Sequence, residues 1–419
     1  MLSLMAFFSL YLLNGPSSAK IEYPTFPHSL FGAVIPSCAL LFLVSIGSAY
    51  LLRVLVIDIN CNLRWIYFLH AILHMMLLVL SVSACLFNTA SICDRILILL
   101  EQIRLNLKLY SVFRTIVGSK FGQKMFSRRI SVENPFSASK LLYFYFAPVL
   151  IYQSFYLRVA NDKKGGLFRF LYDSACHVFK FCVSVYLLLF IFHQVIGPYF
   201  ANLTIADAKG SFWSNTPLFN DFEFLKKSLG LFCCLGTPIF LLCFFFFFEA
   251  WMNFWADILS FEDRSFYEDW WNSCSFSQFY RKWNCIVHDF LYTYLYGDFI
   301  RYFRESSIVD PSLAKGISAL LVFNISAVVH EFIISFSLGF FYPVLFILFS
   351  GPGVVLCAFF QKATYDRRLN AIFWLFMFLG LGLTIFLYSF EYCCRTLLFT
   401  HIFDTYAVDP LVSHLFFSR

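Results

Sequence analysis

The sequence predicts an all-α polytopic membrane protein that crosses the bilayer with about eight or nine transmembrane helices. Of its 419 residues, 60% are hydrophobic and only 13% are charged. That balance leaves too few polar residues to cover a soluble domain of this size. The apolar residues gather in runs of about 20, the length at which a helix crosses the hydrocarbon core. The positive charges cluster between these runs, as they do in cytosolic loops.

The apolar runs that predict spans cover residues 31–52, 65–87, 178–200, 229–256, 313–338, 340–360 and 371–390. Two further segments are ambiguous. Residues 91–113 are amphipathic, which fits either a helix that crosses the membrane beside a cavity or one that lies in the interface. Residues 141–157 contain Pro148, which interrupts a helix and favours a re-entrant or interfacial segment.

The segments between the runs sort by charge. Lysine and arginine are concentrated in residues 114–140, 161–169 and 362–368, which predicts a cytosolic location for them. Residues 201–228 are balanced in charge and contain the sequon Asn202-Leu203-Thr204, which predicts a lumenal location. Followed along the chain, these assignments place residues 257–311 in the cytosol and the C-terminus in the lumen.

A histidine lies within the apolar run 313–338. At about 100° per residue, the helix face that holds His330 also holds Lys315, Ala319, Val322, Ser326 and Ser337. Lys315 lies about 22 Å from His330 along this face. A cation at the predicted cytosolic end and a buried imidazole at that distance fit the two ends of an extended pantetheine arm of coenzyme A.

The simpler interpretation of His330 is a core histidine bonded to a neighbouring helix. The adjacent Glu331 favours a functional role, because ionisable groups within the hydrocarbon are costly. Glu331 itself shares a face with Asn324 and Ser335, where we expect it to be hydrogen-bonded and non-catalytic. A zinc site is not predicted, since HEFII lacks the second histidine of the HExxH pattern.

Residues 265–299 carry a second polar group beside a span. After Ser275, helical periodicity places six side chains within an arc of about 120° on one helix: Ser277, Gln278, Arg281, Asn284, His288 and Tyr296. An arc with an arginine and a histidine fits the wall of a site for a phosphate-bearing ligand. A solvated helix face is the alternative. The tryptophans before this helix fit an aromatic belt at the level of the lipid headgroups.

Three blocks resemble signature motifs of the membrane-bound O-acyltransferase family, and of its sterol O-acyltransferase branch in particular. They are FYEDWWN at 266–272, FYRKWNCIVHDFLY at 279–292 and SAVVHEF at 326–332. With weaker similarity on either side, the resemblance covers about residues 60–390. It implies the all-α membrane-bound O-acyltransferase fold. We expect one such domain over residues 1–419, without the family's long N-terminal cytosolic region.

The resemblance also implies roles for individual residues. His330 matches the family's catalytic histidine, and Asn284 matches its partner asparagine. The positions that match contacts to acyl-CoA are Gln278, Arg281, Asn284, His288, Tyr296, Lys315 and Ser326. The FYxDWWN motif comprises Phe266, Tyr267, Asp269, Trp270, Trp271 and Asn272.

The reaction that this resemblance implies is transfer of a long-chain acyl group from acyl-CoA to the hydroxyl of a sterol, in the endoplasmic reticulum membrane. Acyl-CoA is then a co-substrate, and neither a resident cofactor nor a metal is required. The expected partners are acyl-CoA, a sterol or other lipid alcohol, and membrane lipid. Nucleic acid is not expected, and formation of a homo-oligomer stays open.

Other functions stay open beside this one. Diacylglycerol O-acyltransferases share FYxDWWN but usually depart from the VHDFLY and SAVVHE blocks. A proton-coupled membrane transporter would use His330 and Glu331 as a proton relay. A receptor or scaffold would bind sterol without turnover. Formation of an ester in detergent, without a sealed membrane, separates the enzymes from the other two classes.

Overall fold

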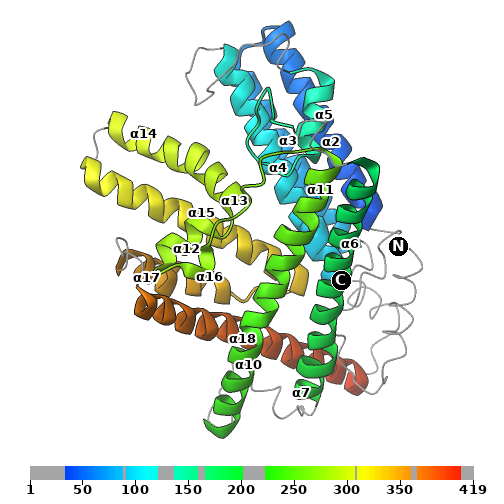
Figure 1. Ribbon diagram of the computed structural model, residues 1–419, viewed down its shortest axis with the longest axis vertical. Coiled ribbons are helices and arrows are strands. Elements are labelled where there is room, and N and C mark those ends of the chain that lie inside the picture. The colour runs from blue at the N-terminus through cyan, green and yellow to red at the C-terminus, as the bar shows by residue number, and fades with distance from the viewer. Residues whose placement is uncertain are drawn as a thin grey trace.

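A computed structural model describes residues 34–87, 91–120, 136–158, 166–201, 222–306, 309–359 and 366–406. Within these ranges the regular structure is helical (Figure 1), and an isolated β-bridge joins Arg158 to Phe261. The all-α prediction is therefore confirmed. The sequon Asn202-Leu203-Thr204, and most of the segments predicted to be basic loops, lie outside the described residues.

The helices vary widely in length. The longer ones are α2 (Ile35–Arg53), α3 (Leu63–Phe87), α4 (Ile92–Lys120), α6 (Gly166–Ile191), α10 (Phe222–Phe244), α15 (Pro311–Leu338) and α18 (Arg367–Tyr406). The shorter ones are α5 (Ala138–Phe146), α7 (Gly197–Ala201), α11 (Asn253–Ile258), α12 (Phe276–Lys282), α13 (Cys285–Phe290), α14 (Gly297–Ser306), α16 (Val344–Leu348) and α17 (Val354–Phe359). Wider π-helical turns connect several of them: η2 (Val54–Asp58), η4 (Phe192–Ile196), η5 (Phe245–Met252), η7 (Leu291–Tyr296) and η8 (Phe349–Gly353). A short 3₁₀ turn, η6, covers Trp270–Asn272.

Within the described part of the chain, six helical stretches are long and apolar enough to cross a membrane. They are Ile35–Asp58, Leu63–Leu86, Phe168–Phe200, Phe222–Ile258, Pro311–Leu338 and Arg367–Leu397. Each corresponds to a predicted span. The predicted span 340–360 is instead a shorter apolar helix, Val344–Cys357, because residues 340–343 are not helical and Pro343 directly precedes its first turn. The total of eight or nine spans stays a prediction.

The structure describes both ambiguous segments, and only the first is helical throughout its apolar part. The amphipathic stretch 91–113 belongs to α4, which continues to Lys120, so the assignment of residues 114–120 to a loop is wrong. Their helix is held in part by an ion pair between Arg114 and Asp298. The break expected at Pro148 is confirmed, since α5 ends at Phe146.

A buried lysine of α4 donates hydrogen bonds to the carbonyl oxygens at the end of α5. The Nζ atom of Lys108 donates to the carbonyl oxygens of Phe144, Tyr145 and Ala147 at 2.6, 3.1 and 2.8 Å. Arg104 donates to the same Tyr145 oxygen at 2.8 Å. The last carbonyls of a helix have no donor within it, so Lys108, which is only 1% exposed, replaces the donors that α5 lacks.

Replacing Lys108 by methionine is expected to destabilise the protein by about 1–3 kcal/mol, because the Phe144 carbonyl oxygen then loses its donor. Melting temperature in detergent measures the effect. Lys226→Met on α10 is the control, since Lys226 is exposed and its replacement leaves no carbonyl unsatisfied. Equal melting temperatures for the two variants would contradict this role of Lys108.

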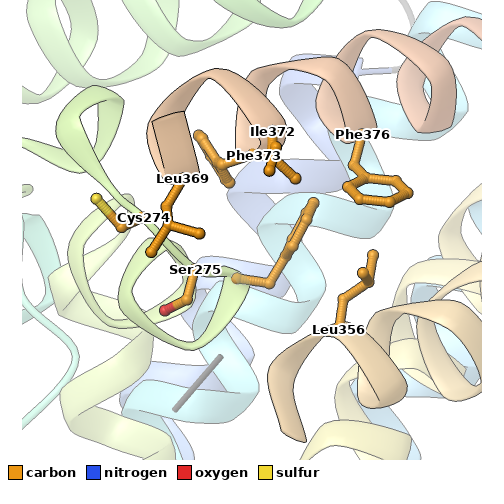
Figure 2. Close-up of a pocket in the computed structure, with 8 residues that line it drawn as sticks. Cys274, Ser275, Leu356, Leu369, Ile372, Phe373 and Phe376 are labelled. Carbon is orange, nitrogen blue, oxygen red and sulfur yellow. The ribbon is translucent and has the colours of Figure 1, made fainter. Parts of the chain in front are cut away.

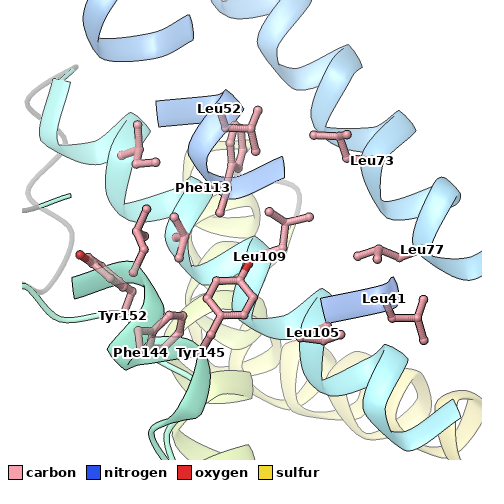
Figure 3. Packing of buried hydrophobic residues seen from close by; sticks show 14 of the residues in the cluster. Leu41, Leu52, Leu73, Leu77, Leu105, Leu109, Phe113, Phe144, Tyr145 and Tyr152 are labelled. Carbon is pink, nitrogen blue, oxygen red and sulfur yellow. The ribbon is translucent and has the colours of Figure 1, made fainter. Parts of the chain in front are cut away.

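The largest buried cluster lies between α2, α3, α4 and α5. Leu41, Leu73, Leu105 and Phe113 are among its members, and each is at most 7% exposed. Figure 3 shows these side chains gathered in the cluster together with Tyr145. The Tyr145 hydroxyl lies 3.0 Å from the hydroxyl of Ser45 on α2. The cluster fixes α4, which in turn packs against α15.

The helices α10 and α18 cross at close range (Figure 1). A Cβ atom added to Gly236 would lie 2.6 Å from the backbone nitrogen of Gly382. A Cβ atom added to Gly382 would lie 2.5 Å from the Cα atom of Cys233. Small residues at helix crossings in membranes let two backbones approach in this way.

Replacing Gly382 by alanine is expected to destabilise the protein by about 1–3 kcal/mol, the usual cost of overpacking. The two nearest atoms that the new methyl group meets, Cα and N of Cys233, belong to the backbone of α10 and cannot rotate away. Gly380→Ala on the same helix is the matched control, because a Cβ atom there meets nothing within 4 Å. Equal melting temperatures for Gly382→Ala and Gly380→Ala would show that α10 and α18 can move apart at this crossing without loss of stability.

Candidate active site

The imidazole of His330 is half-buried on α15. Its Nδ1 atom lies 2.7 Å from the carbonyl oxygen of Ser326, one turn earlier on the same helix. A carbonyl oxygen only accepts hydrogen bonds, so Nδ1 donates and holds the ring proton. In the neutral ring the lone pair then lies on Nε2, which is the atom left to act as a base.

Lys315 lies near the start of the same helix. α15 begins with Pro311 in its first turn and ends at Gly339, whose φ of 80° reverses the chain. The Lys315 side chain is exposed, and it forms no ion pair with any residue that the structure describes. α15 therefore joins an unpaired cation to His330 over about 22 Å.

Glu331 is 4% exposed and fully engaged in hydrogen bonds. The Tyr388 hydroxyl lies 3.1 and 2.9 Å from its two carboxylate oxygens. The Ser335 hydroxyl and the backbone N–H of Phe346 donate to it at 3.2 and 3.1 Å. The prediction of a hydrogen-bonded Glu331 on the face next to His330 is confirmed.

These bonds fix the start of α16 against α15 and α18. The N–H of Leu345 donates to the Tyr388 hydroxyl at 3.0 Å, so Glu331 and Tyr388 together hold the first turn of α16. Phe349 follows that helix, and its ring centroid lies 5.6 Å from the ring of His330. By holding the first turn of α16, Glu331 therefore affects how Phe349 packs against the ring of His330.

Phe349 also connects His330 to α12. Its ring lies 5.7 Å from the ring of Tyr280 and 5.5 Å from that of Phe323, and Tyr280 and Phe323 are 4.9 Å apart. Arg281 follows Tyr280 directly in the chain. The aromatic cluster therefore brings the polar residues of α12 toward the base.

Asn284 lies between two helices, so the single helix predicted after Ser275 is wrong. α12 ends at Lys282 and α13 begins at Cys285. Asn284 has φ −145° and ψ 80°, and its Oδ1 accepts the N–H of Val287 at 3.1 Å. A side-chain cap of this kind starts a new helix. With Oδ1 engaged, the amide offers its Nδ2 hydrogens.

Backbone hydrogen bonds from the FYxDWWN loop hold the chain on both sides of the break at Asn284. The N–H of Glu268 donates to the Lys282 carbonyl at 2.8 Å, and the N–H of Cys285 donates to the Phe266 carbonyl at 3.0 Å. The Lys282 ammonium pairs with Asp269 at 2.5 Å and lowers the pKa of that carboxyl. The motif thereby fixes the residues on both sides of Asn284.

The other motif residues anchor the loop to the membrane helices. The Tyr267 hydroxyl donates to Glu249 of η5, and Trp374 of α18 donates from Nε1 to the Trp271 carbonyl at 3.1 Å. Trp270 is 2% exposed, so the aromatic-belt interpretation is wrong for it, whereas Trp271 and Asn272 are exposed. The motif therefore has a structural role through its buried and hydrogen-bonded residues.

The remaining predicted acyl-CoA contacts differ in their surroundings. The Gln278 side chain accepts the N–H of Cys274 at 2.9 Å, which gives it a local structural role. Arg281 is exposed, and its guanidinium forms no ion pair within the described ranges. His288 and Tyr296 both stack on Tyr292, at 6.0 and 5.3 Å with ring planes within 17°.

Tyr292 is a residue that the periodicity argument missed. Tyr292 is 59% exposed. Its ring lies between those of His288 and Tyr296, which are four residues before and after it in the chain. That spacing was the available signal, because residues four apart on a helix are neighbours. The three rings form a ladder on one exposed face of α13 and η7.

The structure brings some of these residues together and leaves others apart. Phe349 links His330 to α12, and η7 packs against α15. No hydrogen bond joins His330 to Asn284 among the described residues. In those ranges, no group of three or more histidine, cysteine or acidic side chains could hold a metal ion.

A small apolar recess lies where the residues at the start of α12 meet α17 and α18 (Figure 2). Its lining residues come from the start of α12, from α17 and from α18: Cys274, Ser275, Phe276, Leu356, Leu369, Ile372, Phe373 and Phe376. Neither His330 nor Asn284 contributes to it. The recess is lined mainly by apolar side chains, and among its lining residues only Cys274 has an ionisable group.

Comparison with known proteins identifies the family. The model of the membrane-bound O-acyltransferase family matches residues 66–390. This chain is a membrane-bound O-acyltransferase. The matched region contains the break at Asn284, the FYxDWWN loop and all of α15, so each candidate site residue lies within the part that defines this acyltransferase family.

Several relatives of this acyltransferase are sterol O-acyltransferases. Sterol O-acyltransferase 2 of Mus musculus is 36% identical over 308 residues, which cover 72% of this chain and 52% of the relative. Sterol O-acyltransferase 2 of Homo sapiens is 35% identical over 302 residues, with the same coverage. Sterol O-acyltransferase 1 of Mus musculus is 33% identical over 304 residues, or 72% and 51% of the two chains. The chain thus spans about half the length of these relatives.

Proposed function

We propose that this acyltransferase moves a long-chain fatty acyl group from acyl-CoA to the hydroxyl of a sterol, giving a steryl ester and CoA. The observation that carries the proposal is the position of His330. It lies in the block that resembles sterol O-acyltransferases, and its Nδ1 is held by a carbonyl so that Nε2 is free to accept a proton. The similarity to relatives with that name supports the choice of sterol.

The first step needs a base. A sterol hydroxyl has a pKa far above 7, so it is a poor nucleophile until a proton acceptor lies beside it. Nε2 of His330 takes the hydroxyl proton while the sterol oxygen bonds to the thioester carbon. The Ser326 carbonyl then stabilises the imidazolium through Nδ1, and burial limits the access of water as a competing acceptor.

The second step needs an oxyanion donor and a proton for the leaving group. The thioester oxygen becomes negative in the tetrahedral intermediate, and the Nδ2 hydrogens of Asn284 stabilise it. Collapse of the intermediate breaks the carbon–sulfur bond. His330 returns its proton to the CoA thiolate, so the base is restored and no other proton donor is needed.

Several side chains fit the binding of acyl-CoA. Arg281 and Lys315 are cations without ion pairs among the described residues and suit its phosphates. His288, Tyr292 and Tyr296 offer parallel ring faces on α13 and η7. No metal or resident cofactor enters this mechanism.

We place the protein in the endoplasmic reticulum membrane, by analogy with the sterol O-acyltransferase branch. The asymmetry of basic residues supports a cytosolic location for residues 257–311, where acyl-CoA is soluble, and a lumenal C-terminus. Assembly into a homo-oligomer would be compatible with this arrangement and is tested by the mass of the purified protein in detergent.

Purified protein given labelled oleoyl-CoA is expected to esterify sterol in preference to diacylglycerol when both are present at equal mole fraction in mixed micelles. The products are separated and counted. The expectation rests on the SAVVHEF and FYRKWNCIVHDFLY blocks. A heat-denatured sample measures transfer without enzyme.

The alternatives predict different products. Triacylglycerol as the main product would place the chain among diacylglycerol O-acyltransferases. Absence of any ester, combined with proton-dependent uptake by sealed vesicles, would favour a transporter. Sterol binding without ester formation would favour a receptor.

A further inference from the structure

The helix pair of α14 and α15 carries two unpaired cations at the end where α14 leads into α15. The helical turns α13, η7 and α14 follow one another without a break from Cys285 to Ser306, and α14 packs against α15 (Figure 1). Arg304 lies two residues before the end of α14, and Lys315 lies four residues after the start of α15. At about 1.5 Å per residue, the two positions are within about one turn of each other along the pair.

The packing of the two helices places these cations on one side of the pair. Phe303 is half-buried between exposed neighbours near the end of α14, and Ala314 is 1% exposed near the start of α15, so these two residues face the partner helix. Consecutive helices that pack side by side across a short connection run antiparallel. Because both are right-handed, the residue that follows each contact residue turns toward the same side of the pair. Those two residues are Arg304 and Lys315.

Neither cation is neutralised by the protein. Both side chains are exposed, and neither forms an ion pair within the described ranges. Glu305 lies about 200° round the helix from Phe303 and therefore on the outer side of α14. Two unpaired cations on one side of a helix pair attract a ligand that carries more than one phosphate.

Arginine and lysine suit different phosphates. The guanidinium of arginine is a planar fork that bonds two oxygens of a terminal phosphate at once, whereas the lysine ammonium is a point charge. CoA offers both kinds of group: a pyrophosphate in the chain that leads to the thiol, and a 3′-phosphate on the ribose beyond it. The 3′-phosphate is a monoester and carries about −1.5 to −2 charges at pH 7.

We propose that Arg304 binds the 3′-phosphate of acyl-CoA, beside the pyrophosphate at Lys315. The inference rests on the proposed function, in which the thioester lies at His330 and the pyrophosphate about 22 Å away at Lys315. The ribose follows the pyrophosphate, so its phosphate meets the next cation on the same side of the helix pair. Arg304 thereby selects donors that carry the whole of CoA over donors that carry only its pantetheine phosphate.

Binding of two unreactive thioethers, S-hexadecyl-CoA and its 3′-dephospho form, tests the proposal on the full-length protein in detergent. The wild type should bind the dephospho ligand about three- to tenfold more weakly, less than a buried charged hydrogen bond gives, because both groups stay partly in water. Arg304→Gln should weaken binding of S-hexadecyl-CoA by the same factor and leave the Kd of the dephospho ligand unchanged. Arg304→Lys keeps the charge without the fork and should fall between.

Two further variants serve as comparisons. Lys315→Gln should weaken both ligands equally, because both contain the pyrophosphate. Lys226→Gln removes an exposed lysine of α10 that is predicted to lie on the other side of the membrane, and it should change neither Kd. Equal weakening of both ligands in Arg304→Gln would overturn the assignment to the 3′-phosphate. Unchanged Kd values in that variant, or equal Kd values of the wild type for the two ligands, would overturn the site.

Anionic lipid headgroups offer the same phosphate chemistry. Nanodiscs of phosphatidylcholine, with and without phosphatidylserine, separate the two sources, and the effect of Arg304→Gln on the Kd should appear in both. An effect confined to nanodiscs with phosphatidylserine would assign Arg304 to lipid and overturn the proposal. If the wild type binds S-hexadecyl-CoA but makes no steryl ester, the proposed function fails while this comparison still stands.

Discussion

Replacing His330 by alanine is expected to lower kcat by about 10²–10⁴-fold, the usual contribution of a positioned general base. Binding of acyl-CoA should survive, since Lys315 lies about 22 Å from the base along α15 and alanine at position 330 leaves both Arg281 and Lys315 in place. Folding should survive as well, because alanine favours helix and the Ser326 carbonyl can still accept the backbone N–H one turn later. The measurement is kcat per folded molecule, with folding checked by gel filtration and melting temperature.

Glu331→Gln is the control for this variant. Its carboxylate accepts three donors, and an amide would turn an N–H toward one of them. We therefore expect a lower melting temperature with a kcat loss milder than that of His330→Ala. If His330 is a core histidine instead, His330→Ala would lose stability while its folded fraction kept near-normal turnover, and that result would refute the mechanism.

Hydropathy and helical periodicity predicted much of this fold and site from local information. The spans follow from the length of the apolar runs, and the engagement of Glu331 follows from its offset from His330 on α15. Its partner Tyr388 lies 57 residues further on, so no local pattern could identify it. The same holds for Lys108, whose carbonyl partners are 36 to 39 residues away.

The break at Asn284 shows where periodicity fails. The polar residues keep a helical spacing through it, and one residue with changed dihedral angles separates α12 from α13. Asparagine is found both inside helices and at their caps. The sequence alone therefore did not show whether Asn284 continues one helix or starts another. The π-helical turns are missed for a related reason: each keeps an apolar composition and alters only the hydrogen-bond register.

Replacing Asn284 by aspartate is expected to lower kcat by about 10²–10³-fold without loss of stability. Aspartate is as good a helix cap as asparagine, so its carboxylate can still accept the Val287 N–H. It has no N–H to offer the oxyanion, and its charge opposes the negative charge that develops there. Both kcat per folded molecule and melting temperature are needed, because the prediction is that only the first changes.

Asn284→Ala tests the helix cap and the oxyanion donor together. It removes both the cap, at a cost of about 0.5–2 kcal/mol, and the oxyanion donor, so it should lose stability as well as kcat. Combining His330→Ala with Asn284→Asp should be little worse than the worse single variant, because both act on one chemical step. If Asn284 serves only as the cap of α13, Asn284→Asp would keep full turnover while Asn284→Ala lost only stability, and the oxyanion assignment would have to be abandoned.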